Sequence, residues 1–202
     1  MYGHKSGPPD LNPDIKRLLR PTKVVERSEP MTQLLDIPLV THKGMTTTSK
    51  VIGKRCVILQ LFYTRCDGTC PGTTALLSDT AKALGERLGR DVTILSISLD
   101  TTRDSVADIR QYARLHNVPD GWYVAAVSPS DASALLKQLR LPEVKLGGDG
   151  RIKHTQMVYY GTNAGGRWRM IASKAATPKL LVKMAMFTQN TTTPAMLSNF
   201  GE

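Results

Sequence analysis

Two cysteines and a proline stand close together in the stretch "YTRCDGTCPGT" (63–73). Cys66 and Cys70 are separated by three residues, and Pro71 follows the second cysteine directly. Two thiols at this spacing can hold a soft metal ion, cycle between dithiol and disulfide, or simply pack in a core. The spacing alone leaves these three alternatives open.

The runs on either side of the cysteines predict a seam between a strand and a helix. The run "CVILQLFY" (56–63) is mostly apolar, which is typical of a buried strand, and the run 72–88 has apolar residues at helical spacing. Pro71 suits the first position of that helix and places Cys70 near its N-cap. The free N–H groups and partial positive charge of a helix N-terminus stabilise a thiolate, so a cysteine there is a better nucleophile and metal ligand.

A metal site would need a further ligand, because two thiolates and an imidazole suit Cu(I) in three-coordination or zinc in four. His4 lies in an N-terminal arm, His42 in an early extended segment, and His116 at the end of a predicted helix. His154 ends the Gly-rich loop 142–154, just before a predicted strand. In a thioredoxin-like sheet this loop passes beside the cysteine loop, so His154 is our candidate third ligand.

The rest of the chain alternates between predicted strands and predicted helices. Short extended segments are predicted within 34–47, strands at 91–100 and 121–128, helices at 103–116, 130–141 and 177–187, and a hairpin at 155–161 and 167–173. This alternation is typical of an α/β protein whose mostly parallel sheet is covered by helices on both faces. The C-terminal hairpin adds antiparallel strands, and the element order is that of a thioredoxin-like domain with an inserted helical unit.

The length and composition indicate one globular domain of ordinary size, since 41% of the 202 residues are hydrophobic and 22% are charged. We place this domain at 34–187, between an extended N-terminal arm (1–33) and an irregular tail (188–202). No apolar run reaches the roughly 18 residues that a membrane-spanning helix requires. The third cysteine, Cys56, falls inside the apolar strand and is expected to be an inert buried thiol.

The chain is basic, with a formal net charge of +10 at pH 7, and much of the excess lies in the C-terminal third (140–202). A basic surface favours acidic protein partners, anionic lipid or nucleic acid, although a solubilising face is the simplest explanation. Nucleic acid is disfavoured, because the basic residues are scattered, aromatic residues make up only 5% of the chain, and no nucleic-acid motif is present.

Four segments of the chain resemble the Sco/SenC family, the thioredoxin-like copper proteins of cytochrome c oxidase assembly. These segments are "LFYTRCDGTCP", "ISLDTTRDSVADIRQYA", "DGWYVAAVSPSDASALLKQLRL" and "IKHTQMVYYGTNAGGRW". They match the family's C-x-x-x-C-P motif, the acidic segment after the next strand, a Trp-containing strand with its helix, and a strand that begins with the ligand histidine. The resemblance extends from about residue 34 to residue 187.

The resemblance implies that Cys66, Cys70 and His154 bind one copper ion, Cu(I) or Cu(II), and that the two cysteines can also form a disulfide. Asp100 and Asp104 match acidic positions of the family, and a structural role for Asp100 is as well supported as a functional one. The implied function is a copper metallochaperone whose partners are a copper-receiving oxidase subunit or other assembly factors. The implied location is the mitochondrial inner membrane or intermembrane space, or a bacterial periplasmic face.

Several residues depart from the family pattern. Asp67 and Gly68 lie between the cysteines where the family usually has Pro followed by Asp, and Lys153 precedes the histidine where the family usually has Asp. Two alternative functions therefore stay open. One is a thiol–disulfide oxidoreductase in which Cys66 and Cys70 are the redox pair. The other is a Sco-like structural subunit of a larger respiratory complex, associated with that membrane complex through the arm and the basic C-terminal third.

Overall fold

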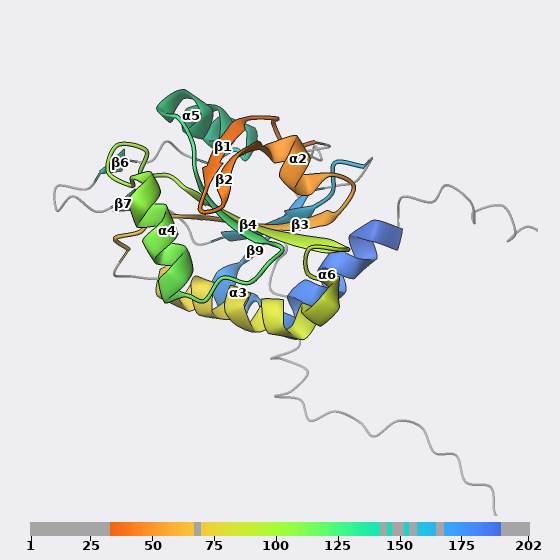
Figure 1. The fold of residues 1–202 in the computed structure, drawn as a ribbon. Helices are drawn as coiled ribbons and strands as arrows, with labels where there is room; N and C mark the ends of the chain where they lie inside the picture. Colours follow the sequence, from red (N-terminus) through yellow and green to blue (C-terminus); the bar gives the residue numbers. More distant parts are fainter. Residues whose placement is uncertain are drawn as a thin grey trace, which may run out of the picture.

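A mixed sheet of seven strands, in the order β2-β1-β5-β4-β3-β8-β9, forms the centre of the computed structural model (Figure 1). The structure describes residues 33–66, 70–141, 145–146, 152–153, 157–164 and 168–190. The strands are β1 (Pro38–Thr41), β2 (Gly44–Thr47), β3 (Cys56–Phe62), β4 (Val92–Ser98), β5 (Trp122–Ala126), β8 (Met157–Gly161) and β9 (Arg169–Ala172), together with the separate pair β6 (Lys145–Leu146) and β7 (Ile152–Lys153). The helices are α2 (Thr48–Ile52), α3 (Cys70–Leu84), α4 (Val106–Leu115), α5 (Pro129–Gln138) and α6 (Pro178–Asn190).

The three central strands β3, β4 and β5 run parallel, and antiparallel strands extend the sheet at both edges. β1 pairs with β5 and β2 with β1 on one side, while β8 pairs with β3 and β9 with β8 on the other. The predicted α/β class and the C-terminal hairpin are therefore confirmed. The sheet is less parallel than expected, because the extended segments within 34–47 form an antiparallel pair that joins the sheet through β5.

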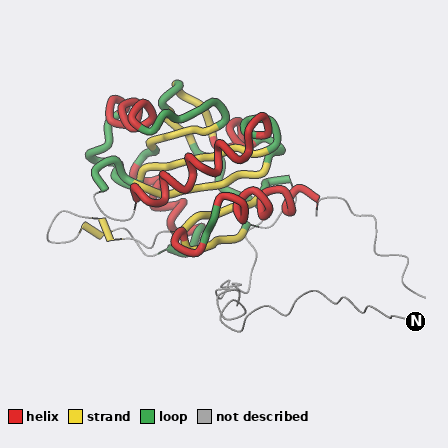
Figure 2. The backbone as a smooth tube through the Cα atoms, turned by 90° about the horizontal axis from the view of Figure 1, so that it is seen from below, coloured by secondary structure: helices red, strands yellow, loops and turns green. Residues whose placement is uncertain are grey.

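Helices cover both faces of the sheet, as predicted, and Figure 2 shows them lying across the strands when the molecule is seen from below. α3, α4 and α6 pack on one face in a cluster that includes Ile58 and Ile94. α5 and the short helix α2 pack on the other face in a cluster that includes Leu59 and Leu95. Successive residues of β3 point to opposite clusters, which explains why the strand is apolar at nearly every position.

A capping box determines where α4 begins, and the residues before it form a turn. The hydroxyl of Ser105 accepts the N–H of Asp108 (3.2 Å), and the carboxylate of Asp108 accepts the N–H of Ser105 (2.8 Å). The helix therefore begins at Val106, three residues later than predicted. The preceding residues, 100–104, form a turn whose carboxylates contribute to the cysteine site.

The other differences from the predicted elements concern short pieces. α2 has five residues, and β6 and β7 have two each, which is too short for a periodic pattern to predict them. None of the helices in the described part of the chain is long and apolar enough to span a bilayer. The domain boundaries at residues 34 and 187 are not tested by the structure and stay predictions.

Candidate metal and redox site

Cys66 and Cys70 occupy the predicted seam between β3 and α3. Cys66 follows the end of β3, and Cys70 is the first residue of α3. A disulfide joins the two cysteines, and their Cα atoms are 5.8 Å apart, inside the usual range for a disulfide. Cys70 is buried and Cys66 is partly buried, whereas residues 67–69 lie outside the described part of the chain. The two sulfurs are therefore side by side at the end of the sheet where the parallel strands β3 and β4 finish.

The buried carboxylate of Asp104 anchors the segment that leads into the cysteine loop. Its Oδ2 accepts the backbone N–H of Thr64 (2.9 Å), and its Oδ1 accepts the hydroxyl of Thr64 (2.5 Å). The hydroxyl of Ser98, the last residue of β4, also donates to Oδ2 (2.5 Å). Asp104 is only 6% exposed, so these bonds satisfy a charge that water does not reach well. It thus ties the ends of β3 and β4 together, two residues before Cys66.

Asp100 holds the turn that carries Asp104. Its Oδ2 accepts Nε of Arg103 at 2.6 Å, and its Oδ1 accepts the hydroxyl of Thr102 at 3.4 Å. Its own N–H donates to the hydroxyl of Ser98 (3.1 Å), and its carbonyl accepts the N–H of Asp104 (2.9 Å). These contacts give Asp100 a structural role at the end of β4.

The buried hydroxyl of Thr74 is hydrogen-bonded to the backbone of Cys70. Thr74 donates its hydroxyl hydrogen to the carbonyl of Cys70 (3.0 Å), one turn earlier in α3. The Thr74 oxygen then accepts the hydroxyl of Tyr112 (2.5 Å) and Nε2–H of Gln60 (3.3 Å), which uses both of its lone pairs. Burial raises the pKa of Tyr112 to about 12, so this hydroxyl keeps its proton well into the alkaline range.

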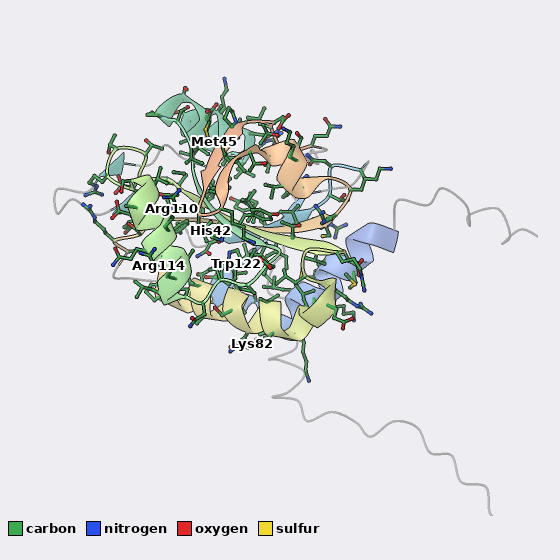
Figure 3. All side chains as sticks on the ribbon, viewed as in Figure 1. His42, Met45, Lys82, Arg110, Arg114 and Trp122 are labelled. Atoms are coloured by element: carbon green, nitrogen blue, oxygen red, sulfur yellow. A yellow bond between two sulfur atoms is a disulfide. The ribbon has the colours of Figure 1, made fainter. Side chains whose placement is uncertain are left out.

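The hydrogen-bonded chain continues across the sheet to Trp122. Oε1 of Gln60 accepts the hydroxyl of Ser96 (3.1 Å), and the Ser96 oxygen accepts Nε1–H of Trp122 (3.0 Å). All three side chains are fully buried, and Figure 3 shows Trp122 in the interior of the molecule. The chain of hydrogen bonds therefore runs from β5 through β4 and β3 to the first turn of α3. The sequence did not predict it, because the pairing depends on β3 and β4 placing Gln60 opposite Ser96.

The two described histidines serve packing. Nδ1 of His42 accepts the N–H of Val124 (3.3 Å), and burial lowers the pKa of this imidazole. His116 packs against Tyr112 in a tilted arrangement with ring centroids 4.4 Å apart, and burial lowers its pKa too, which disfavours a charged role at the end of α4. Within the described residues, no three His, Cys, Asp or Glu side chains form a group able to hold a metal ion. His154 lies outside those residues, so its place at the site stays a prediction.

Comparison with known proteins identifies a family for the chain. The family model for SCO1/SenC matches residues 35–189. Among solved structures, Arabidopsis thaliana ScoI with copper bound is 18% identical, with a TM-score of 0.65 over 78% of this chain and 98% of that chain. Yeast Sco1 with copper bound is 21% identical, with a TM-score of 0.63 over 81% of this chain and 92% of that chain.

A third solved structure is BsSco, described as a member of the Sco family of cytochrome c oxidase assembly proteins with a disulfide switch. It is 20% identical, with a TM-score of 0.67 over 80% of this chain and 96% of that chain. No curated protein matches the chain by sequence. The likeness to these structures confirms the thioredoxin-like fold. Because the family model spans most of the chain, the resemblance found in the sequence is confirmed, and the protein belongs to the SCO1/SenC family.

Proposed function

We propose that the protein is a copper-binding metallochaperone that takes part in cytochrome c oxidase assembly. The observation that carries the proposal is the pair Cys66 and Cys70, held side by side at the start of α3 in a SCO1/SenC chain. The solved relatives from Arabidopsis and yeast have copper bound, which supports copper as the metal. In this proposal copper is the cargo that the protein receives and hands on.

The donor set fits copper. In the reduced protein two thiols replace the disulfide, and Cu(I) prefers soft thiolate ligands. The Cα atoms are 5.8 Å apart, so both sulfurs can reach one ion without displacing the strand or the helix that carries them. Arg65 and the first turn of α3 add positive charge beside the thiolates, which favours their deprotonated form.

The strand pairing supports His154 as the third ligand. β8 runs antiparallel to β3, with Val158 opposite Gln60, so Met157 lies toward the end of β3 that leads to the cysteines. His154 precedes Met157 by three residues in sequence, a span of roughly 10 Å at most. This pairing brings the strand that follows His154 to the end of β3 that leads to Cys66, which supports His154 as a ligand shared with Cys66 and Cys70.

Loading requires a dithiol reductant and Cu(I), and delivery requires ligands from the partner. A dithiol reductant supplies two electrons and two protons to open the disulfide, and Cu(I) then displaces the two thiol protons. Delivery is a ligand exchange, in which thiolate, thioether or imidazole groups of the partner replace the sulfurs one at a time. Asp104 and Thr74 hold the two ends of the cysteine loop, so that the exchange starts from a fixed geometry.

The proposed partner is a copper-receiving oxidase subunit or another assembly factor. The proposed location is the mitochondrial inner membrane or intermembrane space, or the periplasmic face of a bacterial membrane. The alternative is that the chain is a structural subunit of a respiratory complex. This alternative would hold if the chain co-purifies in such a complex and the complex stays intact when both cysteines are replaced.

A Cu(I) titration of the fully reduced protein against a competing chelator tests the proposal. We expect one-to-one binding that is lost in Cys66→Ser and Cys70→Ser and weakened by about tenfold or more in His154→Ala. Cys56→Ala is the matched control, because this third thiol is buried within β3. Binding of Cu(I) no tighter than that of the protein lacking Cys66 and Cys70 would contradict the proposal.

The disulfide favours a second candidate function, that of a thiol–disulfide oxidoreductase. One thiolate of the reduced pair attacks a disulfide of the partner to form a mixed disulfide, and the other thiolate releases the partner as a dithiol. Two electrons pass to the partner, and the Cys66–Cys70 bond is restored. Activity on a partner disulfide that is unchanged in His154→Ala would favour this function over copper delivery.

A further inference from the structure

The exposed face of α4 is basic. Val106, Arg110 and Arg114 are spaced four residues apart, so they share one side of the helix. All three side chains are exposed, and Figure 3 labels the two arginines along α4. Asp108 is the one carboxylate in this helix, and its hydrogen bonds with Ser105 engage it in the capping box.

Arg65 continues this basic face toward the cysteines. It is exposed and directly precedes Cys66. The pKa of Asp108 is lowered mainly by its hydrogen bonds with Ser105, and the charge of Arg65 lowers it further. The hydrogen bonds of Thr64 to Asp104 also place the segment that carries Arg65 beside the start of α4. We name the following residues together the α4 face: Arg65, Val106, Arg110 and Arg114.

Among the residues that the structure describes, no ion pair neutralises the arginines of the α4 face. The printed ion pairs join Lys43 to Asp120, Lys82 to Asp79, Arg90 to Asp91 and Arg103 to Asp100. Within the described residues, none of the three arginines of the α4 face takes part in an ion pair. Val106 adds an exposed apolar side chain among them, at 38% exposure. The result is a cationic surface with an apolar spot, beside the cysteine loop.

A second basic helix provides an internal comparison. Lys179 and Lys183 are exposed and four residues apart on α6, with the same charge and spacing as the arginines of α4. Protein interfaces are enriched in Arg and depleted in Lys, because a planar guanidinium can bind a carboxylate through two parallel hydrogen bonds. The lysine pair therefore fits a solubilising surface, and the arginine pair fits a docking surface.

We propose that the α4 face is the docking surface for an acidic segment of the protein that exchanges copper or electrons with Cys66 and Cys70. The role of this docking rests on the proposed function, but the binding of the acidic segment itself needs neither copper nor free thiols. Carboxylates of the partner would pair with Arg110 and Arg114, and Arg65 would guide the end of the segment to the cysteine loop. The contact with Val106 selects a polypeptide that carries an apolar residue among its acidic ones.

The test uses the oxidised, copper-free full chain and a fluorescein-labelled decaglutamate peptide as the probe. Fluorescence anisotropy at low ionic strength gives the dissociation constant of the peptide. We expect Arg110→Gln combined with Arg114→Gln to weaken binding about tenfold, since two partly exposed charge pairs are lost. Lys179→Gln combined with Lys183→Gln removes the same net charge and should weaken binding less than about twofold.

Three results would overturn the proposal. Equal losses in the two double variants would mean that the peptide senses only the net charge of the protein. Absence of measurable binding to the unmodified chain would remove the docking surface altogether. Binding of single-stranded DNA or of vesicles with phosphatidylglycerol could also be measured. If that binding falls more than peptide binding does in the Arg110 and Arg114 double variant, the face belongs to that ligand instead. Cu(I) affinity, measured separately, should be unchanged in both variants, so a failure of copper binding cannot be mistaken for a failure of docking.

Discussion

The two faces of the central sheet use the same strands in different ways. On the face covered by α2 and α5, the buried side chains of β3 and β4 are apolar apart from Thr93, and they pack as an ordinary core. On the face covered by α3 and α4, Gln60 and Ser96 are fully buried, and their hydrogen-bonded chain ends at the carbonyl of Cys70. Buried polar groups cost free energy unless they are hydrogen-bonded. The polar groups of the second face therefore add little to the stability of the core, but their hydrogen bonds fix the orientation of the backbone at Cys70. We infer that one face mainly sets stability and the other mainly sets the geometry of the cysteine turn.

The substitution Leu59→Ala should separate the two faces most strongly. Leu59 is fully buried on the α2 and α5 face, and its truncation is expected to cost about 3 kcal/mol in unfolding free energy through lost burial and a cavity. Denaturant unfolding measures this loss. The Cu(I) affinity of the folded variant should stay within about twofold of that of the unmodified protein. A large change in that affinity would mean that the faces are not separable.

Alkaline pH should act on the polar face. Burial raises the pKa of Tyr112 to about 12 from its ordinary value near 10. The pKa of Tyr112 is higher in the folded than in the unfolded protein. Its contribution to the free energy of unfolding is therefore fully present below pH 10 and falls by about 2 kcal/mol as the pH rises toward 12. Unfolding free energies measured across this interval give the slope, and Tyr112→Phe should flatten it. An equally steep slope in the Phe variant would assign the effect to other groups.

The substitution Asp104→Asn should weaken both stability and the cysteine site. The amide replaces one acceptor by a donor in front of Thr64 and Ser98, at an expected cost of up to about 2 kcal/mol. We expect the Cu(I) affinity to fall about tenfold, because the segment before Cys66 loses its anchor. Asp36→Asn is the control, since Asp36 accepts the N–H and hydroxyl of Ser49 in the same way at an exposed position. Equal effects of the two substitutions on Cu(I) binding would show that Asp104 does not position the loop.

The smallest and most specific effect is expected for Thr74→Val. The substitution keeps the shape but removes the hydroxyl that donates to Cys70 and accepts from Tyr112 and Gln60, at a cost of about 1 kcal/mol. The reduction potential of the Cys66–Cys70 pair should shift. Thr80→Val is the matched control, because Thr80 makes the same bond to the carbonyl of Leu76 farther along α3. A shift of the same size in Thr80→Val would assign the effect to the helix as a whole.

The difference between the faces also explains what the sequence could predict. The alternation of apolar runs and amphipathic runs predicted the α/β class, the main strands and the helices on both faces, because burial leaves a periodic pattern. The strand and helix around Cys66 and Cys70 were predicted for the same reason, helped by Pro71. The buried polar chain was not predicted, since Gln60 and Ser96 become partners only through the register of β3 against β4.

The roles of the two acidic residues after β4 needed the structure as well. Asp104 follows the strand closely and precedes Ser105, so it was included in a helix that in fact begins at Val106. The pair Ser105 and Asp108 is a recognisable capping signal, and it would have moved the predicted start of the helix. No local pattern, however, indicates that the Asp104 carboxylate reaches Thr64, forty residues earlier.

The burial of Cys56 has a consequence for the fidelity of oxidation. Cys56 begins β3 and Cys66 follows its far end, so a strand of seven residues, roughly 20 Å long, separates the Cys56 thiol from the reactive pair. Because Cys56 is fully buried, it can reach neither an oxidant nor the Cys66–Cys70 bond while the sheet is intact. The protein can therefore pass through many cycles of reduction and oxidation without scrambling its pairing, although it has an odd number of thiols. The rate at which a thiol reagent labels Cys56 in the oxidised protein would then report the opening of the sheet, independently of the state of the site.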